Sequence, residues 1–212
     1  MRDIPIFTSE YGAAGLVLKE IPYQQTAYIT IHASEDPEKL IEECVSFCRA
    51  CGAERIYASG HEALDVFPFH TSVIRMRCGR DSIPQNDVCV FPVQEHTVSQ
   101  WQKLYNEKIP HVPNGAWMTG AEARKLAGSG EGYFVHRDGV LLGIGKVSGE
   151  TIDFLAAVQP GAGGDVLCAL SHILPGENVE LTVASANQKA VKLYERFGFI
   201  PVNEISRWYQ VF

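Results

Sequence analysis

Residues 151–170 read TIDFLAAVQPGAGGDVLCAL, and this stretch decides the fold. Apolar and β-branched residues over 151–158 predict a strand, which Gln159-Pro160 ends. Three glycines then lead into a segment whose apolar residues follow helical spacing. A strand that runs through glycines into a helix leaves several N–H groups unpaired at the positive end of the helix dipole, so this turn can hold a phosphate or diphosphate. Glycines that serve only close packing are the alternative, and it stays open at this point.

A second stretch, NQKAVKLYERFGF at residues 187–199, predicts a helix that stops at a glycine. One face of this helix carries apolar side chains and a tyrosine: Ala190, Val191, Tyr194 and Phe197. A core stripe with a buried tyrosine explains that face without any chemistry. Ser185 and Gln188 have the spacing of a capping box and are expected to begin the helix.

The order of strand, glycine turn, helix, strand and C-terminal helix resembles the GCN5-related N-acetyltransferase (GNAT) family over residues 97–212. The family's motif is matched at Asn187, Ala190, Leu193, Tyr194, Glu195, Gly198 and Phe199. The resemblance implies an N-acyltransferase, with acetyl-CoA as cosubstrate and no metal. An acetyl or small acyl group would pass to a primary amine of a small molecule or polypeptide, and the sequence does not identify that acceptor.

The resemblance also implies roles for single residues. The backbone of Ala156 and Val158 would pair with the pantetheine arm, and Asn187 would lie near that arm. Tyr194 would lie near the thioester sulfur and protonate the departing thiolate. The turn amides that would bind the pyrophosphate are those of Gly161, Ala162, Gly163 and Gly164.

The turn differs from the family pattern in two ways. It is about two residues shorter than V-x-P-x-x-[QR]-G-x-G-x-[GA], and Asp165 stands where a helix start would meet phosphate. A catalytically inactive GNAT-like module that binds acyl-CoA, or only a protein partner, is therefore the alternative function.

A general base for the attacking amine is not evident. Glu150, Asp153 and His136 lie on or beside the expected sheet, and each is also explained as a surface residue. A water chain to solvent would serve equally well, because an alkylamine with a pKa of about 10 must lose a proton before it attacks.

The expected fold class is α/β (α+β), with a mixed, mostly antiparallel sheet flanked by helices. Within the second half, Thr119 and Glu122 form a capping box, and Asp138-Gly139 predicts a hairpin. The segments FIPV and SRWYQVF are expected as separate strands near the C-terminus. We expect a domain boundary near the polar segment 80–92, which gives an N-terminal subdomain over 1–92 and a GNAT-like domain over 93–212.

The N-terminal half could be a degenerate copy of the same design or an ordinary appended α/β subdomain. It shows strand patterns at 13–18, 26–31, 55–58 and 71–78, and a helix that begins at Asp36-Pro37. The link that corresponds to the glycine turn is HASEDPEK, which is acidic and would repel a pyrophosphate. We therefore expect this half not to bind CoA, and to cover or shape the acceptor site.

Composition excludes several classes of protein. The chain has 212 residues with 18 basic and 25 acidic side chains, a net charge of −7, and no basic stripe for nucleic acid. No apolar run is long enough to cross a membrane. With no signal sequence evident, the six cysteines are expected to be reduced thiols in a cytoplasmic protein, and Cys44, Cys48 and Cys51 to be buried filler. A homodimer is a further expectation.

Overall fold

The computed structural model describes residues 4–212. The chain forms two compact units: unit 1 comprises the residues up to Val73 together with Ile205–Phe212, and unit 2 comprises Ile74–Glu204. Strands β5 (Phe69–Gly79) and β11 (Ile200–Gln210) each contribute residues to both units.

The boundary differs from the expected one after residue 92. Segment 80–92 is polar and reads as a linker, but Ile83 is only 2% exposed and belongs to the core of unit 2. This one buried side chain attaches the polar segment to the core of unit 2. The polarity of the surrounding sequence does not predict that contact. The C-terminal residues also form one long strand, β11, in place of the two expected short ones.

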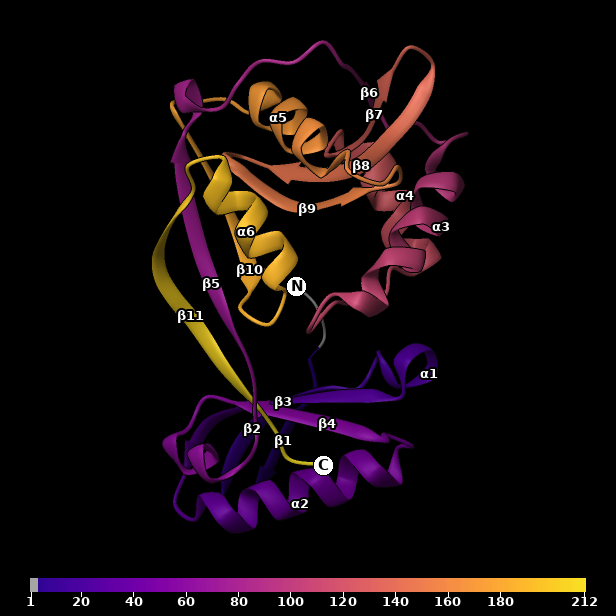
Figure 1. Cartoon of the computed structure of the whole chain (residues 1–212). Coiled ribbons are helices and arrows are strands. Elements are labelled where there is room, and N and C mark those ends of the chain that lie inside the picture. Colours follow the sequence, from indigo (N-terminus) through magenta and orange to yellow (C-terminus); the bar gives the residue numbers. More distant parts are fainter. Residues whose placement is uncertain (1–3) are drawn as a thin grey trace. The chain divides into compact units, whose positions relative to one another are not determined.

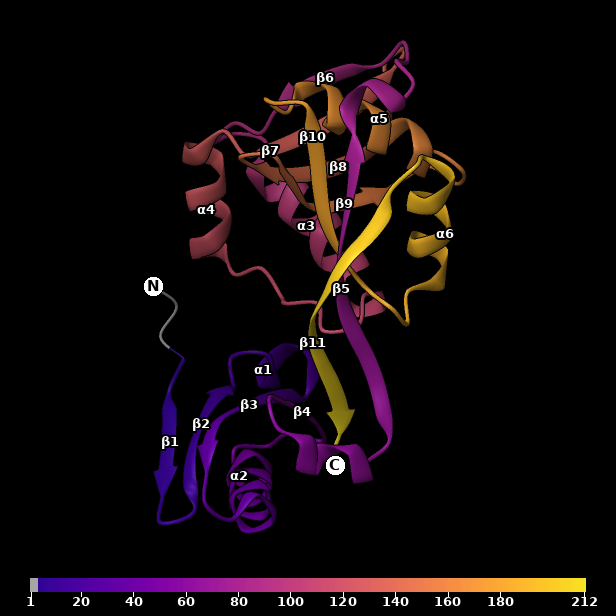
Figure 2. The ribbon, with the colours of Figure 1, turned by 90° about the vertical axis from the view of Figure 1, so that its left-hand side faces the viewer.

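Unit 1 is a small sheet with one face covered by a helix (Figures 1 and 2). Its strands pair in the order β1-β2-β3-β4-β11, antiparallel throughout except for the parallel pair β3 and β4. The elements are β1 (Ile6–Ser9), β2 (Gly12–Val17), α1 (Ile21–Gln24), β3 (Thr26–Ser34), α2 (Pro37–Ala50), β4 (Arg55–Ser59) and a 3-10 turn (Glu62–Val66).

Local signals set the main helix of unit 1. The Asp36 carboxylate accepts a hydrogen bond from the Lys39 amide at 3.2 Å, and Pro37 occupies the first helical position. Cys44 and Cys48 are fully buried against the sheet, whereas Cys51 is exposed at the helix end. The filler role expected of the first two cysteines is confirmed, and that of Cys51 is wrong.

Unit 2 has helices on both faces of a larger sheet (Figure 1). The strand order is β11-β5-β10-β9-β8-β7-β6, in which β9 and β10 are parallel and the pairs among β6 to β9 are antiparallel. The remaining elements are a 3-10 turn (Arg80–Ser82), β6 (Cys89–Pro92), α3 (Val98–Lys108), a second 3-10 turn (Ile109–His111), α4 (Gly120–Ser129), β7 (Gly132–Arg137), β8 (Val140–Ser148), β9 (Thr151–Ala157), α5 (Gly163–Ile173), β10 (Asn178–Ala184) and α6 (Gln188–Arg196).

The expected mixed, mostly antiparallel sheet with flanking helices is confirmed. Helices α5 and α6 pack in the core on one face of β8 and β9, and α3 and α4 pack on the other. The hairpin turns at Asp138 and Gly139, both with positive φ, and Thr119 and Glu122 form the expected capping box. None of the described helices is long and apolar enough to span a membrane.

Candidate functional site

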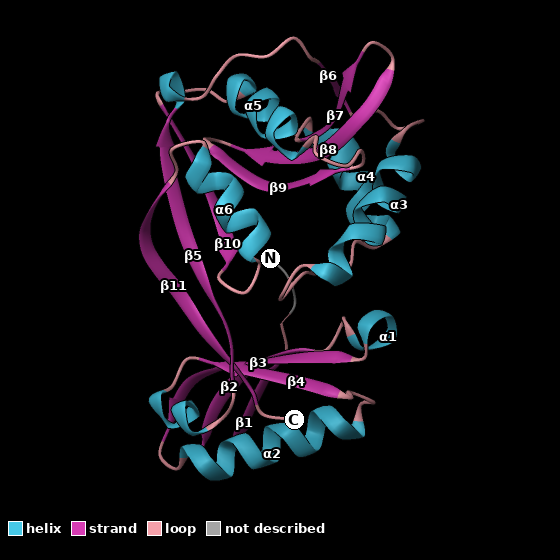
Figure 3. Ribbon diagram, viewed as in Figure 1, coloured by secondary structure: helices cyan, strands magenta, loops and turns pink. Residues whose placement is uncertain are grey.

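The parallel strands β9 and β10 are joined over only a short length. Their register contains two pairs, Thr151 with Glu180 and Ile152 with Leu181. Beyond these pairs β9 is bound to β8 alone, and Figure 3 shows β9 and β10 diverging. The register shift between β8 and β9 leaves Asp153 without a partner residue in β8, which is a bulge at the point of separation. Residues 153–157 therefore form an open strand edge inside the sheet of unit 2.

The ladder decides which backbone groups face that edge. The Val158 N–H donates to the Leu142 carbonyl at 2.8 Å, and Ala157 pairs with Gly143. Because alternate residues of an antiparallel strand direct their polar groups to opposite sides, Ala156 binds toward β8, while Leu155 and Ala157 face away from it. The N–H groups of Ala156 and Val158 therefore serve the β8 ladder, and the residues whose groups face the edge are Leu155 and Ala157.

The glycine turn between β9 and α5 carries unpaired amides. Ala162 donates to the Gln159 carbonyl at 3.2 Å, but within residues 4–212 no acceptor is found for the N–H groups of Gly161, Gly163 and Gly164. Gly161 has a φ of +84° and is exposed, so the turn requires glycine there. Three amides at one helix start suit an anion.

Two of these glycines also have a packing role. A Cβ at Gly164 would lie 2.9 Å from Phe197 Cζ, and one at Gly163 would lie 3.2 Å from Leu193 Cδ2. These contacts place the start of α5 directly against α6. The packing explanation that the sequence left open therefore holds for Gly164, which is buried.

Asp165 is neutralised by an arginine of β7. Arg137 Nη2 lies 2.8 Å from Asp165 Oδ1, and Arg137 Nη1 lies 3.2 Å from Oδ2. Asn86 donates to the Asp165 carbonyl at 2.9 Å. Sequence reasoning missed both partners, because neither lies near residue 165 in the chain.

Helix α6 presents Tyr194 from a buried position. The side chain is 8% exposed, and its ring centroid lies 5.9 Å from that of Phe199. Burial raises the pKa of Tyr194 to about 12. No hydrogen-bond partner of its hydroxyl is found in the part of the chain that the structure describes. The hydroxyl is thus protonated at neutral pH and keeps a proton that it can donate.

Asn187 begins α6 in place of the expected capping box. Its side-chain oxygen accepts from the Ala190 amide at 3.2 Å, while Gln188 Nε2 donates to the Ser185 carbonyl at 2.8 Å. Asn187 is therefore the N-cap, and its conformation is explained by helix capping alone.

None of the three base candidates places an unbonded side-chain group at the open edge. The Asp153 carboxylate accepts from Lys146 Nζ at 2.7 Å and from the Ser148 hydroxyl at 2.9 Å. Glu150 lies in the turn at the other end of β9, beside Gly176. His136 lies on β7, which β8 separates from β9.

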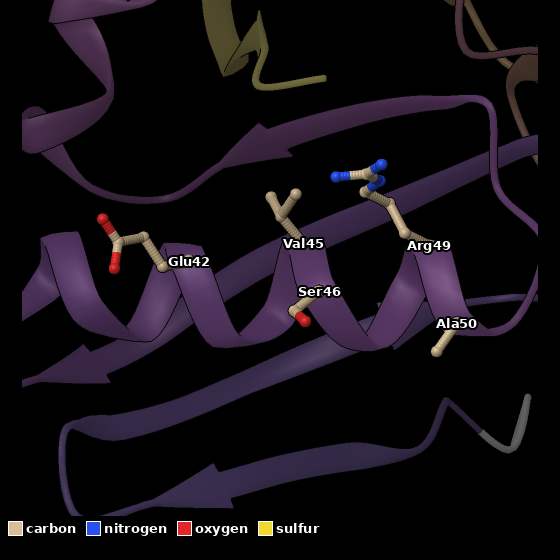
Figure 4. A pocket seen from close by; sticks show the side chains of 5 residues that line it. All are labelled: Glu42, Val45, Ser46, Arg49 and Ala50. Atoms are coloured by element: carbon tan, nitrogen blue, oxygen red, sulfur yellow. The ribbon is translucent and has the colours of Figure 1, made fainter.

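Two pockets, one in each unit, are lined by residues outside this edge. In unit 1 a pocket of about 450 Å³ follows α2, lined by Glu42, Val45, Ser46, Arg49 and Ala50 (Figure 4). In unit 2 a pocket of about 400 Å³ lies between β6, β7 and the start of α3, with Phe91, His96 and His136 among its lining. Over residues 4–212 no group of three or more His, Cys, Asp or Glu is arranged to hold a metal.

Comparisons with known proteins identify the fold. No protein-family model and no curated protein sequence matches the chain. A tandem GNAT protein from the clavulanic acid biosynthesis pathway matches with a TM-score of 0.57 and 13% identity, over 96% of this chain and 80% of that one. The chain has the GNAT fold.

Two further structures match nearly the whole of this chain. A GCN5-related N-acetyltransferase from Anabaena variabilis matches with a TM-score of 0.60 and 12% identity, over 98% of this chain and 58% of that one. A conserved protein of unknown function from Staphylococcus epidermidis matches with a TM-score of 0.60 and 12% identity, over 99% and 94% of the two chains. At these identities the likeness establishes the GNAT fold alone.

Proposed function

We propose that this chain is an N-acyltransferase that moves an acetyl or small acyl group from acyl-CoA to a primary amine. The observation that carries the proposal is the open edge of β9, which leads directly into a turn with three unpaired amides. An edge of unpaired peptide groups suits an extended arm that contains amides, and the turn suits a diphosphate. CoA combines both features.

The residues of unit 2 would mainly position the acyl-CoA, and one of them would donate a proton. Leu155 and Ala157 would orient the arm through their edge-facing peptide groups, and one of their N–H groups would stabilise the oxyanion. The acyl thioester supplies the activated carbonyl. As the amine N–C bond forms and the C–S bond breaks, the Tyr194 hydroxyl would give its proton to the thiolate, and the amine loses a proton to solvent.

Unit 1 is proposed to be a degenerate copy of this design. It has the same order as β7 to β10: an antiparallel hairpin, an antiparallel third strand, and a helix crossing to a parallel fourth strand. Its β3 and β4 are paired at five positions, from Thr26 with Arg55 to Thr30 with Ser59, so it has no comparable open edge. The Asp36 carboxylate occupies the start of its helix. We therefore expect one CoA per chain.

Calorimetry with acetyl-CoA tests the cosubstrate. Ala157→Pro removes an N–H that the β8 ladder does not use, while Ala157→Ser keeps it. The proline variant is expected to bind CoA about three- to tenfold more weakly, the cost of one hydrogen bond, and the serine variant to bind normally. Circular dichroism checks that both variants fold. No binding at millimolar acetyl-CoA would refute the proposal.

Release of free thiol over a panel of amines then tests transfer. Thiol release that depends on the amine supports an enzyme. If acetyl-CoA binds but no amine causes release of free thiol, the alternative is favoured: a catalytically inactive GNAT-like module that binds acyl-CoA.

A further inference from the structure

The pocket of about 400 Å³ between β6, β7 and the start of α3 lies wholly in unit 2. β6 ends the strand order on this side of the described sheet, and β8 separates its neighbour β7 from β9. The pocket is therefore distinct from the open edge at which acyl-CoA is proposed to bind.

Two phenylalanines form the wall that the strands provide. Phe91 of β6 and Phe134 of β7 lie directly opposite each other in the ladder, so their side chains share one face of the sheet. Phe134 is buried in the core that includes α3, whereas Phe91 is 52% exposed. A half-exposed ring in a pocket offers a surface to a flat apolar group.

Hydrogen bonds fix the wall that the start of α3 provides. The Gln94 N–H donates to Thr97 Oγ1 at 2.9 Å, and the Thr97 hydroxyl donates to the Gln94 carbonyl at 3.2 Å. Trp101 Nε1 donates to the Tyr133 carbonyl at 3.0 Å, which joins α3 to β7. The two walls are therefore held together without a ligand.

His136 of β7 lines this pocket with unpaired nitrogens. Its Nδ1 is buried and has no hydrogen-bond partner, and no partner of Nε2 is found within residues 4–212. The imidazole lies at 81° to the Phe91 ring, with centroids 5.5 Å apart. Because Nδ1 is buried, a ligand in the pocket can meet only Nε2. An unpaired imidazole beside apolar rings suits a ligand that carries a hydrogen-bonding group.

The lining of the pocket contains no Asp, Glu, Lys or Arg. Two charged residues that adjoin it in the sequence are not part of it: Glu95 is exposed, and Arg137 pairs with Asp165. A charged ligand would lose water here without gaining an ion pair, which is costly. Gln94 and Gln100 line the pocket, and their side-chain amides can both donate and accept. An uncharged amide matches these groups.

The sheet edge beside the pocket is poorly suited to an added peptide strand. The Val93 N–H donates to the Gly132 carbonyl at 2.8 Å, so the alternate residues Val90 and Pro92 direct their backbone groups away from β7. Pro92 has no N–H, which leaves Val90 as the one donor of β6 on that side. A small molecule is therefore favoured over a peptide.

We propose that this pocket binds an uncharged aromatic carboxamide. The ring of the ligand would lie against Phe91, and its amide would meet His136 Nε2 and the glutamine side chains. The binding site consists of β6, β7 and the start of α3, so the proposal holds whether or not the chain transfers acyl groups.

Benzamide, benzoate and benzylamine test this ligand class, because they share a phenyl ring and differ in charge. Ligand-observed NMR titrations of the full chain at pH 8 are expected to show benzamide binding about three- to tenfold more tightly than either charged compound, since it alone brings no unmatched charge and keeps its hydrogen bonds. Equal or tighter binding of benzoate or benzylamine, or no binding of benzamide at tens of millimolar, would overturn the proposal.

Variants locate the site. His136→Phe keeps an aromatic ring and removes both nitrogens, so benzamide should bind about three- to tenfold more weakly. Phe91→Ala should weaken the binding of all three compounds, because each loses the contact with the ring. His111→Phe makes the same change at an exposed histidine outside the pocket and should leave binding unchanged. Circular dichroism checks that each variant is folded. If Phe91→Ala or a folded His136→Phe binds benzamide as tightly as the parent chain, this location is wrong.

Discussion

Arg137 of β7 and Asp165 of α5 form a two-pronged ion pair, with nitrogen to oxygen distances of 2.8 and 3.2 Å. The arginine thereby holds a carboxylate that stands at the start of the helix where the diphosphate is proposed to bind. The pair removes the electrostatic objection that Asp165 raises in the sequence, because the negative charge near the turn is matched by a positive one.

Replacing Arg137 should weaken CoA binding by exposing that charge. We expect Arg137→Gln to lower the affinity for CoA about two- to fivefold at low salt, the size of one helix-terminal charge effect, and less at high salt. Calorimetry at two ionic strengths measures it. The double variant Arg137→Gln/Asp165→Asn should bind as the parent does; if it binds as weakly as the single variant, the charge explanation fails.

Replacing the tyrosine hydroxyl should affect turnover more than binding. Tyr194→Phe keeps the buried ring and removes the proton donor, so kcat is expected to fall about a hundredfold or more while CoA affinity stays the same. Because burial raises the pKa of Tyr194 to about 12, its ionisation should not limit the rate at neutral pH. Thiol-release kinetics and calorimetry separate the two effects, and unchanged turnover would exclude Tyr194 as the acid.

Enlarging Gly164 should destabilise unit 2 whether or not CoA binds. A Cβ there would lie 2.9 Å from Phe197 Cζ, so Gly164→Ala is expected to cost about 1 to 3 kcal/mol of unfolding free energy, as overpacking does. Chemical denaturation measures it. Phe197→Leu in the same chain should recover part of the loss, whereas no recovery would show that the clash is not the cause.

Alkaline pH should reduce the stability of unit 1 through its buried thiols. Burial raises the pKa of Cys44 from 9.0 to about 11 and that of Cys48 from 9.0 to about 12. Since both values are higher in the folded state, the unfolded chain loses these protons first. The stability is therefore full below about pH 9 and falls as pH rises through about 11 to 12.

Thermal melts of Cys48→Ala should show a shallower alkaline decline than the parent chain. Cys51→Ala is the matched control, because Cys51 lies on the same helical turn and is exposed. An identical decline in the two variants would contradict the role of the buried thiol.

Much of the fold was predictable because its signals are local. The Thr119–Glu122 capping box, the Asp138-Gly139 hairpin and the start of α2 at Asp36 each depend on residues within a few positions of one another. Strand and helix periodicity in residues 151–170 depends likewise on neighbours. These features follow from backbone sterics and hydrogen bonds inside one short segment, which is the range that sequence patterns cover.

Other features depend on which strands meet, and only the tertiary structure decided them. Sequence predicted that the strand before the turn would present backbone groups, but the Val158 to Leu142 hydrogen bond determines that Leu155 and Ala157 face the open edge. A register shift of one residue moves each residue's backbone N–H and C=O groups to the opposite edge of the strand. A small error of register therefore assigns the wrong residues to the site.

The opening between β9 and β10 has the same origin. It depends on a bulge at Asp153 within the β8–β9 hairpin, and on pairing between β9 and β10 that stops at Ile152 and Leu181, which are distant in the chain. The sequence by itself determined the elements of this protein and the amide-rich turn. The structure alone decided where a strand edge remains unpaired, because hydrogen bonds between strands join residues that no local pattern relates.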